Sequence, residues 1–351
     1  MSYPAHISTA ALSQQTTSAI ARLQKKLVAA QTELTTGRHA DVGLELGAKT
    51  GLSVALRQDH VQLSAVVESN SLVATRLSAT QASLQNISGI AQNYLAVLVR
   101  AQATTSAAET IVVEAQAGLS SLFEGLDVSV DGQYLFAGIN SDVRPVENYF
   151  GTPAPASRNA VAAAFLSAFG VAQSSPAAQA ITPAQMQTFL NTTLPPEFAD
   201  PNWMNNWSEA SDKNIRSRIG RQELVETSTN ANELAFRDLT AGLVMVADLG
   251  FANLNDSARQ VILDKAIGLV GKAVSGIGDI QSQLGVTQER LKSSTDVLNI
   301  QIRQVTVALG NIENVDEAEV ATRITTLMTH LESAYSITRR IHELSIMDYL
   351  T

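Results

Sequence analysis

The sequence predicts a mainly α-helical protein. Its N- and C-terminal segments form a long antiparallel coiled-coil or helical-bundle rod, which carries an inserted mixed α+β domain. Three observations predict this fold. Apolar residues recur at alternating steps of three and four in both halves of the chain. Every proline except Pro4 lies between Pro145 and Pro201. The 351 residues also exceed what one ordinary core holds.

The first long helix is expected from about Leu52 to Arg100. Its apolar positions follow a coiled-coil seam for about six heptads, and such a helix would be roughly 70 Å long at about 1.5 Å per residue. The strict repeat implies a left-handed supercoil. The positions expected to lie buried in this rod seam are Leu63, Val66, Val73, Leu77, Leu84 and Ile87.

The C-terminal half carries a second seam, from Leu263 to Ile312. Its selected positions are Ile277, Leu284, Leu291 and Leu298. A single amphipathic stripe would indicate ordinary core packing. Two seams of this length, on either side of the middle of the chain, instead favour two long helices that pack side by side. A third inner helix is expected from about Ala107 to Leu126.

Shorter helices are expected at both ends. Gly37 ends the first as a C-terminal stop, and Asp316 with Glu319 has the spacing of a capping box at the start of the last. Their apolar stripes are Ile20, Leu23, Leu27 and Leu34, and then Val320, Ile324, Leu327, Leu331, Ile337, Ile341 and Leu344. We therefore divide the chain into terminal helices (1–45 with 314–351), a helical rod domain (46–130 with 231–313) and an inserted outer domain (131–230).

The insertion begins with the stretch "GQYLFAG", Gly132 to Gly138. Its two glycines suit turns, and Tyr134, Leu135 and Phe136 suit a short strand. We expect this strand to pair with one from residues 214–228, a segment whose alternation predicts a hairpin. Short helices are expected over residues 159–169 and 183–190.

The residues offer little chemistry. There is no cysteine, the five histidines lack metal-ligand spacing, and no phosphate-binding loop or nucleophile elbow is present. We therefore expect no enzyme activity, no metal site and no cofactor. The net charge of −9 argues against nucleic acid as a partner. No apolar run has the roughly 18 residues of a membrane span, and the N-terminus lacks the pattern of a secretory signal peptide. Composition alone would indicate a cytoplasmic protein.

Four stretches resemble the bacterial flagellin superfamily. "QTELTTGRHADVG" (31–43) is similar to the end of the family's first helix, and "LGVTQERL" (284–291) to part of its long C-terminal helix. "GQYLFAGINSDVRPV" (132–146) and "HELSIMDYL" (342–350) resemble the hook–filament junction proteins within the superfamily more than flagellin. The sequence departs from the family at residues 41–51, where "DVGLELGAKTG" replaces a run that resembles S-D-D-P in most members.

The resemblance implies a structural protein of the bacterial flagellum that joins hook to filament. It implies self-association in a helical tube, contact with the other hook-associated junction protein and with flagellin, and an export chaperone in the cytoplasm. It also implies export through the flagellar type III system, an extracellular location, no membrane insertion, and terminal helices that are poorly ordered in the monomer. There are two alternatives. The first is flagellin itself. The second is a signalling coiled coil, and the proline-rich insertion argues against it.

Overall fold

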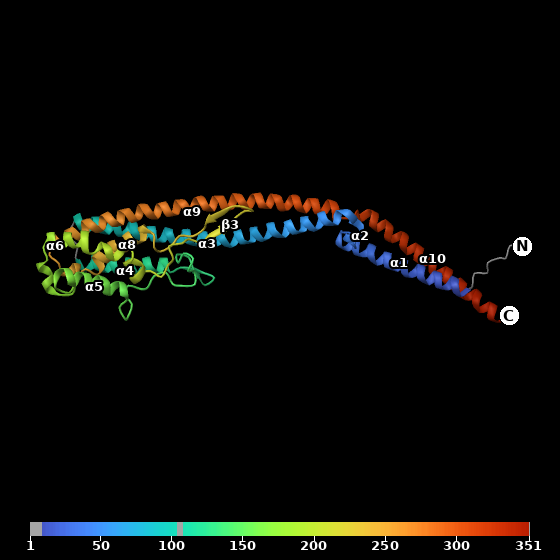
Figure 1. Cartoon of the computed structure of the whole chain (residues 1–351), viewed down its shortest axis with the longest axis horizontal. Coiled ribbons are helices and arrows are strands. Elements are labelled where there is room, and N and C mark those ends of the chain that lie inside the picture. Colours follow the sequence, from blue (N-terminus) through green and yellow to red (C-terminus); the bar gives the residue numbers. More distant parts are fainter. Residues whose placement is uncertain (1–8, 104–107, 351) are drawn as a thin grey trace. The chain divides into compact units, whose positions relative to one another are not determined.

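We describe the protein from a computed structural model, which covers residues 9–103 and 108–350. Helices make up most of this part of the chain, and its strands are short (Figure 1). The mainly helical fold with long helices is therefore confirmed. The chain divides into two compact units, Met1–Ala65 with Leu298–Thr351 and Val66–Val297, which we call the terminal unit and the central unit. The three domain boundaries drawn from the sequence stay a prediction.

The two long helices are α3 (Thr50–Ala103) and α9 (Asp256–Glu313), of 54 and 58 residues. Each contributes residues to both units. Within the central unit they run antiparallel (Figure 1), and the Gln81 side chain of α3 donates a hydrogen bond to the carbonyl of Gln281 on α9, with N and O 2.8 Å apart. The apolar seams lie on their facing sides, because neither helix could bury such a stripe alone.

Two further helices complete the helical core of the central unit. They are α4 (Ala108–Leu126) and α8 (Leu234–Ala247). Helix α4 approaches α3 closely at Gly125, whose carbonyl accepts a hydrogen bond from Ser83 Oγ at 2.6 Å. Helix α8 approaches α9 closely at Gly242, where a Cβ atom would lie 2.7 Å from the Val270 side chain. The small residues therefore set how near these helices pack.

The segment between α4 and α8 holds only short elements. Two antiparallel hairpins are formed by β1 (Ser129–Val130) with β2 (Gln133–Tyr134) and by β3 (Arg216–Arg218) with β4 (Leu224–Glu226). The short helices are α5 (Ala156–Phe169), η2 (Pro176–Ala180), α6 (Pro183–Thr188), η3 (Phe189–Thr193), η4 (Pro195–Phe198) and α7 (Asn202–Asn206), and η5 (Phe251–Asn253) follows α8. Three of them begin at a proline, which suits a first helical turn but not a helix interior.

Aromatic side chains connect this segment to the helices. Trp207 stacks between Tyr149 and Trp203, with ring centroids 5.4 and 5.5 Å away. The Tyr149 hydroxyl donates a hydrogen bond of 2.9 Å to Asp248, the residue that follows α8. The buried side chains of the short elements and of the four helices form one continuous hydrophobic core. Two of its largest members, Trp203 and Tyr149, come from the segment between α4 and α8.

The "GQYLFAG" strand has a different partner from the one predicted. It is limited to Gln133–Tyr134 and pairs with Ser129–Val130, not with residues 214–228. The reason is the two-residue turn between them, where Asp131 and Gly132 have φ angles of 52° and 76° and direct the chain straight back. The second hairpin is confirmed, and Ser217 lies opposite Val225 in it.

The terminal unit is built from α1 (Thr9–Thr36), α2 (Val42–Leu46), η1 (Gly47–Lys49), α10 (Glu317–Leu350) and the adjoining ends of α3 and α9. Gly37 follows α1 with φ of 68°, the left-handed conformation expected of a C-terminal stop. Asp316 Oδ1 accepts hydrogen bonds from the backbone of Ala318 and Glu319, at 2.8 and 3.2 Å, so it caps α10 as predicted.

Candidate assembly surface

Helices α1 and α10 form an antiparallel pair (Figure 1). Near the middle of both helices, Gln24 donates a hydrogen bond of 2.9 Å to the hydroxyl of Tyr335. Nearer the C-terminal end of α1 and the start of α10, Arg323 binds the Glu33 carboxylate at 2.8 Å. The partners run in opposite order along the two helices, which establishes the antiparallel direction. The N- and C-terminal segments predicted to act together are therefore neighbours in the fold.

The core of this pair is small. Its buried apolar residues, within the part of the chain that the structure describes, are Ala30, Val320 and Leu327. Leu23, Leu27, Val315 and Ile324 pack against them and are half-buried. Two helices alone share only one face each, so most of their remaining apolar surface stays in contact with water.

The predicted terminal positions fall into three groups. Val320 and Leu327 are buried, while Ile20, Leu23, Leu27, Ile324, Leu331 and Ile341 are half-buried. Leu34 and Ile337 are exposed, at 40% and 53%. The Leu344 side chain lies outside the described residues. Their role as assembly contacts stays a proposal.

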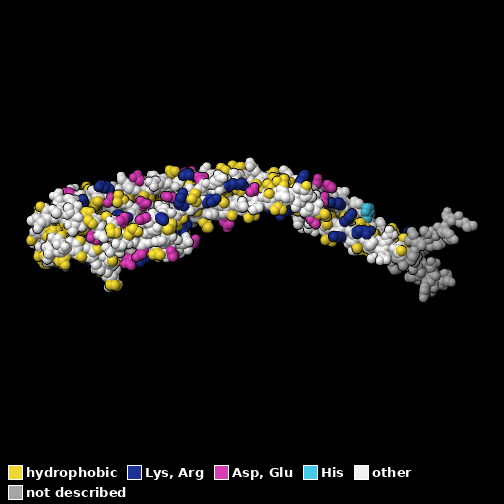
Figure 2. Space-filling model, viewed as in Figure 1, with side chains coloured by type: hydrophobic (Ala, Val, Ile, Leu, Met, Phe, Trp, Pro, Cys, Tyr) yellow, Lys and Arg dark blue, Asp and Glu magenta, His cyan; other side chains and the backbone are white. Residues whose placement is uncertain are grey.

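Large apolar side chains stay exposed on both helices of the pair. They are Leu12, Val28 and Leu34 on α1 and Met328, Tyr335 and Ile337 on α10. Figure 2 shows apolar side chains among the charged ones on this part of the surface. A groove of about 710 Å³ runs between the helices, with Leu23 and Leu327 among its lining residues. Where exposed apolar side chains lie together, they are typical of sites that bind another protein.

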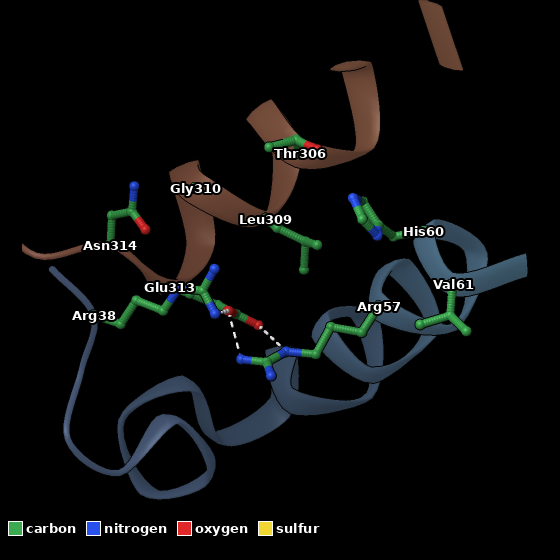
Figure 3. A pocket seen from close by; sticks show the side chains of 9 residues that line it. All are labelled: Arg38, Arg57, His60, Val61, Thr306, Leu309, Gly310, Glu313 and Asn314. Carbon is green, nitrogen blue, oxygen red and sulfur yellow. Dashed lines mark hydrogen bonds and ion pairs between the residues drawn. The ribbon is translucent and has the colours of Figure 1, made fainter. Parts of the chain in front are cut away.

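A second feature of the terminal unit is a polar cluster at the end of α9. The Glu313 carboxylate is 1% exposed and accepts hydrogen bonds from Arg57 Nε at 2.8 Å and Arg57 Nη2 at 2.6 Å (Figure 3). It also accepts one from Ser53 Oγ. The guanidinium of Arg38 lies farther away, 3.9 Å from Glu313 Oε2. We call Arg38, Ser53, Arg57 and Glu313 the Glu313 cluster.

The surroundings favour the charged form of this carboxylate. The hydrogen bonds from Arg57 lower the pKa of Glu313 more than its burial raises it. The hydrogen bond from Ser53 and the positive charges of Arg57 and Arg38 also lower this pKa. The same hydrogen bonds raise the pKa of Arg57. A cavity of about 350 Å³, lined by Arg38, Arg57 and His60 among others, opens beside the cluster (Figure 3).

Sequence reasoning missed the Glu313 cluster. Ser53 and Arg57 lie four residues apart at the start of α3, on one face of the helix. Glu313 lies at the end of α9, in the other half of the chain. No spacing in the sequence connects them, because only the antiparallel arrangement brings the two helix ends together.

The predicted rod positions lie mostly inside the fold. Leu63, Leu77, Leu84, Ile87, Ile277, Leu284, Leu291 and Leu298 are buried, and Val66 and Val73 are half-buried. Leu63 and Leu298 belong to the terminal unit and the others to the central unit. Their place in a functional rod stays a proposal.

The residues of the "GQYLFAG" stretch divide between turn and core. Gly132 and Gly138 have φ angles of 76° and 63°. Tyr134 is half-buried, whereas Leu135 and Phe136 are buried in the core of the central unit. After the strand, the chain contacts the segment near the second hairpin: the Ile139 amide donates to the carbonyl of Lys213 at 2.9 Å, and the Ala231 amide donates to that of Phe136 at 2.7 Å.

The described residues contain no group of three or more His, Asp or Glu side chains arranged to hold a metal ion. None of the helices in that part of the chain is long and apolar enough to cross a membrane. The chemistry that the structure does offer consists of apolar helix faces, ion pairs and hydrogen bonds.

Two family models match the sequence. The bacterial flagellin N-terminal helical region matches residues 7–141, and the bacterial flagellin C-terminal helical region matches residues 267–350. Together the two models cover more than half of the chain. They include α1, α3 and α10 and most of α9. A search of curated protein sequences finds no match.

A solved structure shares this fold. A "putative flagellar hook-associated protein from Vibrio parahaemolyticus" is 9% identical, with a TM-score of 0.53, and the match covers 76% of this chain and 97% of that one. FlgL of Bacillus cereus is 12% identical, with a TM-score of 0.46, and the match covers 75% and 98%. The first likeness concerns the fold. The family assignment comes from the matches at both ends of the sequence, and on these the chain belongs to the bacterial flagellin superfamily, as a non-enzymatic structural component of the flagellum.

Proposed function

We propose that this chain is the flagellar hook-associated protein 3, the junction protein that links the hook to the filament. The observation that carries the proposal is the "GQYLFAG" stretch, which resembles junction proteins more than flagellin. Its Leu135 and Phe136 are buried where the inserted segment leaves the helices. The Vibrio parahaemolyticus protein, which shares the fold, is described as hook-associated, and we carry that role over as part of the proposal.

The terminal helix pair supports a role in assembly. Apolar side chains such as Val28 and Ile337 are exposed on it, and neighbouring copies could cover them. In a helical tube, each subunit uses one surface to bind the subunit before it and a different surface to bind the subunit after it. Such subunit contacts are heterologous, and the assembly that they form is open-ended. We propose that the chain associates with itself in this way, and that the other hook-associated junction protein and flagellin lie on either side.

The proposal includes the route to that location. The chain would be held by an export chaperone in the cytoplasm, leave unfolded through the flagellar type III system, and fold at the hook–filament junction outside the cell. The absence of cysteine and the small core of the terminal pair are compatible with such passage.

The alternative function is flagellin, the filament subunit. It would have the same long helix pairs and the same exposed terminal faces, so these features do not separate the two. The ending "MDYL", where flagellins more often end near L-S-L-L-R, and the "GQYLFAG" stretch favour the junction protein.

Deletion of the gene in its own bacterium tests the proposed function. We expect cells with complete hooks and no filaments, and flagellin released into the medium, because subunits are exported with nothing to attach to. Electron microscopy of the cell surface and immunoblots of the culture medium measure this. Cells that still grow filaments would refute the junction role.

A second measurement separates the two candidates. Sheared flagella are resolved by gel electrophoresis, and the amount of this chain is compared with that of the main filament subunit. We expect it to be scarce, as a component confined to the junction. Abundance equal to that of a filament subunit would establish flagellin instead.

A further inference from the structure

The Glu313 cluster lies where both terminal helices join the ends of α3 and α9. We propose that Glu313, with Arg57 and Ser53, is the positioning residue that fixes the direction of the terminal helix pair within the terminal unit, and that acid releases it. The proposal concerns the folded chain itself and does not rest on the proposed function.

The backbone around Glu313 connects the two linkers that lead to the terminal helices. The amide of His39 donates to the carbonyl of Glu313 at 3.0 Å, and the amide of Val315 donates to that of Gly37 at 3.1 Å. Between them, Arg38 and Asn314 form an isolated antiparallel bridge. Glu313, the last residue of α9, thus binds α3 through its side chain and the linker after α1 through its backbone carbonyl. One residue joins three segments.

Few apolar contacts would hold this arrangement without the cluster. The buried core of the terminal pair, among the described residues, is limited to Ala30, Val320 and Leu327. Helix α2 has no buried residue of its own. The Glu313 carboxylate, which is buried and accepts three hydrogen bonds from Ser53 and Arg57, is therefore a charge-assisted contact between the end of α9 and α3. Its directional bonds also fix geometry more tightly than apolar contacts would.

Charged groups from each neighbouring element determine how this contact responds to pH. Helix α3 contributes Arg57 and His60, and the linker after α1 contributes Arg38 and His39. Helix α1 contributes Glu33, whose carboxylate lies 4.0 Å from His39 and binds Arg323 of α10 at 2.8 Å. Cations thus predominate around the Glu313 carboxylate, which matches the lowered pKa of that group.

The sign of the pH effect follows from that direction. Because the folded-state pKa of Glu313 lies below the unfolded value of about 4.5, its contribution is fully present above about pH 4.5. It is lost as the pH falls from there through the folded-state pKa. Protonation removes the charge that Arg57 and Arg38 bind, so the linkers separate from α3 in acid and stay attached at neutral pH.

Hydrogen exchange of the full-length monomer, followed by mass spectrometry, tests the proposal. The peptides read are those with the amides of His39 and Val315, as protection factors at several pH values from 7 to 3. In the wild type we expect protection to fall by about tenfold in acid. In Glu313→Gln we expect protection at pH 7 to be lower by a similar factor and to depend little on pH. Glu317→Gln, an exposed carboxylate four residues on, is the matched control and should behave as the wild type.

Two results would overturn the proposal: equal protection of both amides in Glu313→Gln and wild type at pH 7, or the same loss of protection in acid in both proteins. Should Glu313→Gln lose helical circular dichroism, Arg57→Lys decides. It keeps the charge and removes the bidentate geometry. We expect intermediate protection with the acid response retained at a higher pH, and protection equal to wild type throughout would overturn the proposal.

Discussion

The ring of Phe136 meets the ring of Phe236 edge-on, with centroids 5.8 Å apart and planes at 89°. Phe136 belongs to the "GQYLFAG" stretch, where the chain leaves the helices, and Phe236 to the first turn of α8, where it returns to them. Both rings are fully buried. This contact therefore holds the start of the inserted segment against the helix that follows its end. The "GQYLFAG" stretch, which resembles the family, supplies one of the two rings.

Replacement of Phe136 by alanine should destabilise the protein by about 3–5 kcal/mol, because it removes a fully buried ring and leaves a cavity. Urea denaturation followed by tryptophan fluorescence measures this, since Trp203 and Trp207 lie in the same core. Ile139→Ala, three residues on and 54% exposed, should change stability by less than about 0.5 kcal/mol. Equal effects of the two substitutions would contradict the placement of Phe136 in the core.

Gly138→Ala should destabilise more than Gly132→Ala. Both glycines have positive φ, which costs about 1–2 kcal/mol for another residue. At Gly138 a Cβ would also collide with the carbonyl oxygen of Ser211 and lie 2.7 Å from that of Lys213, whereas nothing lies within 4 Å of a Cβ at Gly132. Thermal melts of the two variants separate backbone strain from collision, and a lower Tm for Gly132→Ala would refute this reasoning.

Leu77→Asp and Leu284→Asp should each unfold the paired long helices of the central unit. Leu77 is fully buried and Leu284 nearly so, and an unpaired carboxylate there costs several kcal/mol, about 4 or more. Circular dichroism during heating measures the loss. Leu72→Asp on the same helix, at a position 63% exposed, is the control and should melt as the wild type does. An unchanged Tm for either buried variant would show that the seam is not in the core.

Removal of residues 314–351 should leave a folded, soluble monomer that is no longer incorporated into flagella. The large hydrophobic core belongs to the central unit, so its stability does not depend on α10. Helix α1 loses its partner, and with it the surface that we propose for assembly. Size-exclusion chromatography and complementation of the deletion strain measure the two parts of this prediction.

A single substitution makes the same prediction finer. Ile337→Asp places a charge on the exposed face of α10, so the monomer should keep its stability within about 0.5 kcal/mol while incorporation is lost. Filaments that grow normally on a strain carrying either the truncation or this variant would refute the assembly role of α10.

The sequence by itself determined the helices. Heptad spacing predicted α3 and α9, Gly37 and Asp316 predicted a helix end and a helix start, and the resemblance of both ends predicted the family. These signals are local, because a helix satisfies its backbone hydrogen bonds within itself and shows its buried face as a repeat. The hairpin of β3 and β4 could be predicted for the same reason, since its strands are neighbours in the chain.

Only the tertiary structure decided the contacts between distant segments. A two-residue turn at Asp131 and Gly132 gave the "GQYLFAG" strand a partner next to it in the chain, where the sequence had suggested a remote one. The buried Asn232 receives a hydrogen bond from Trp203 at 3.0 Å, and Arg57 reaches Glu313 across the two halves of the chain. The sequence does not show whether a given polar side chain will be exposed to solvent or buried against a hydrogen-bonding partner. That depends on which helix ends the fold brings together.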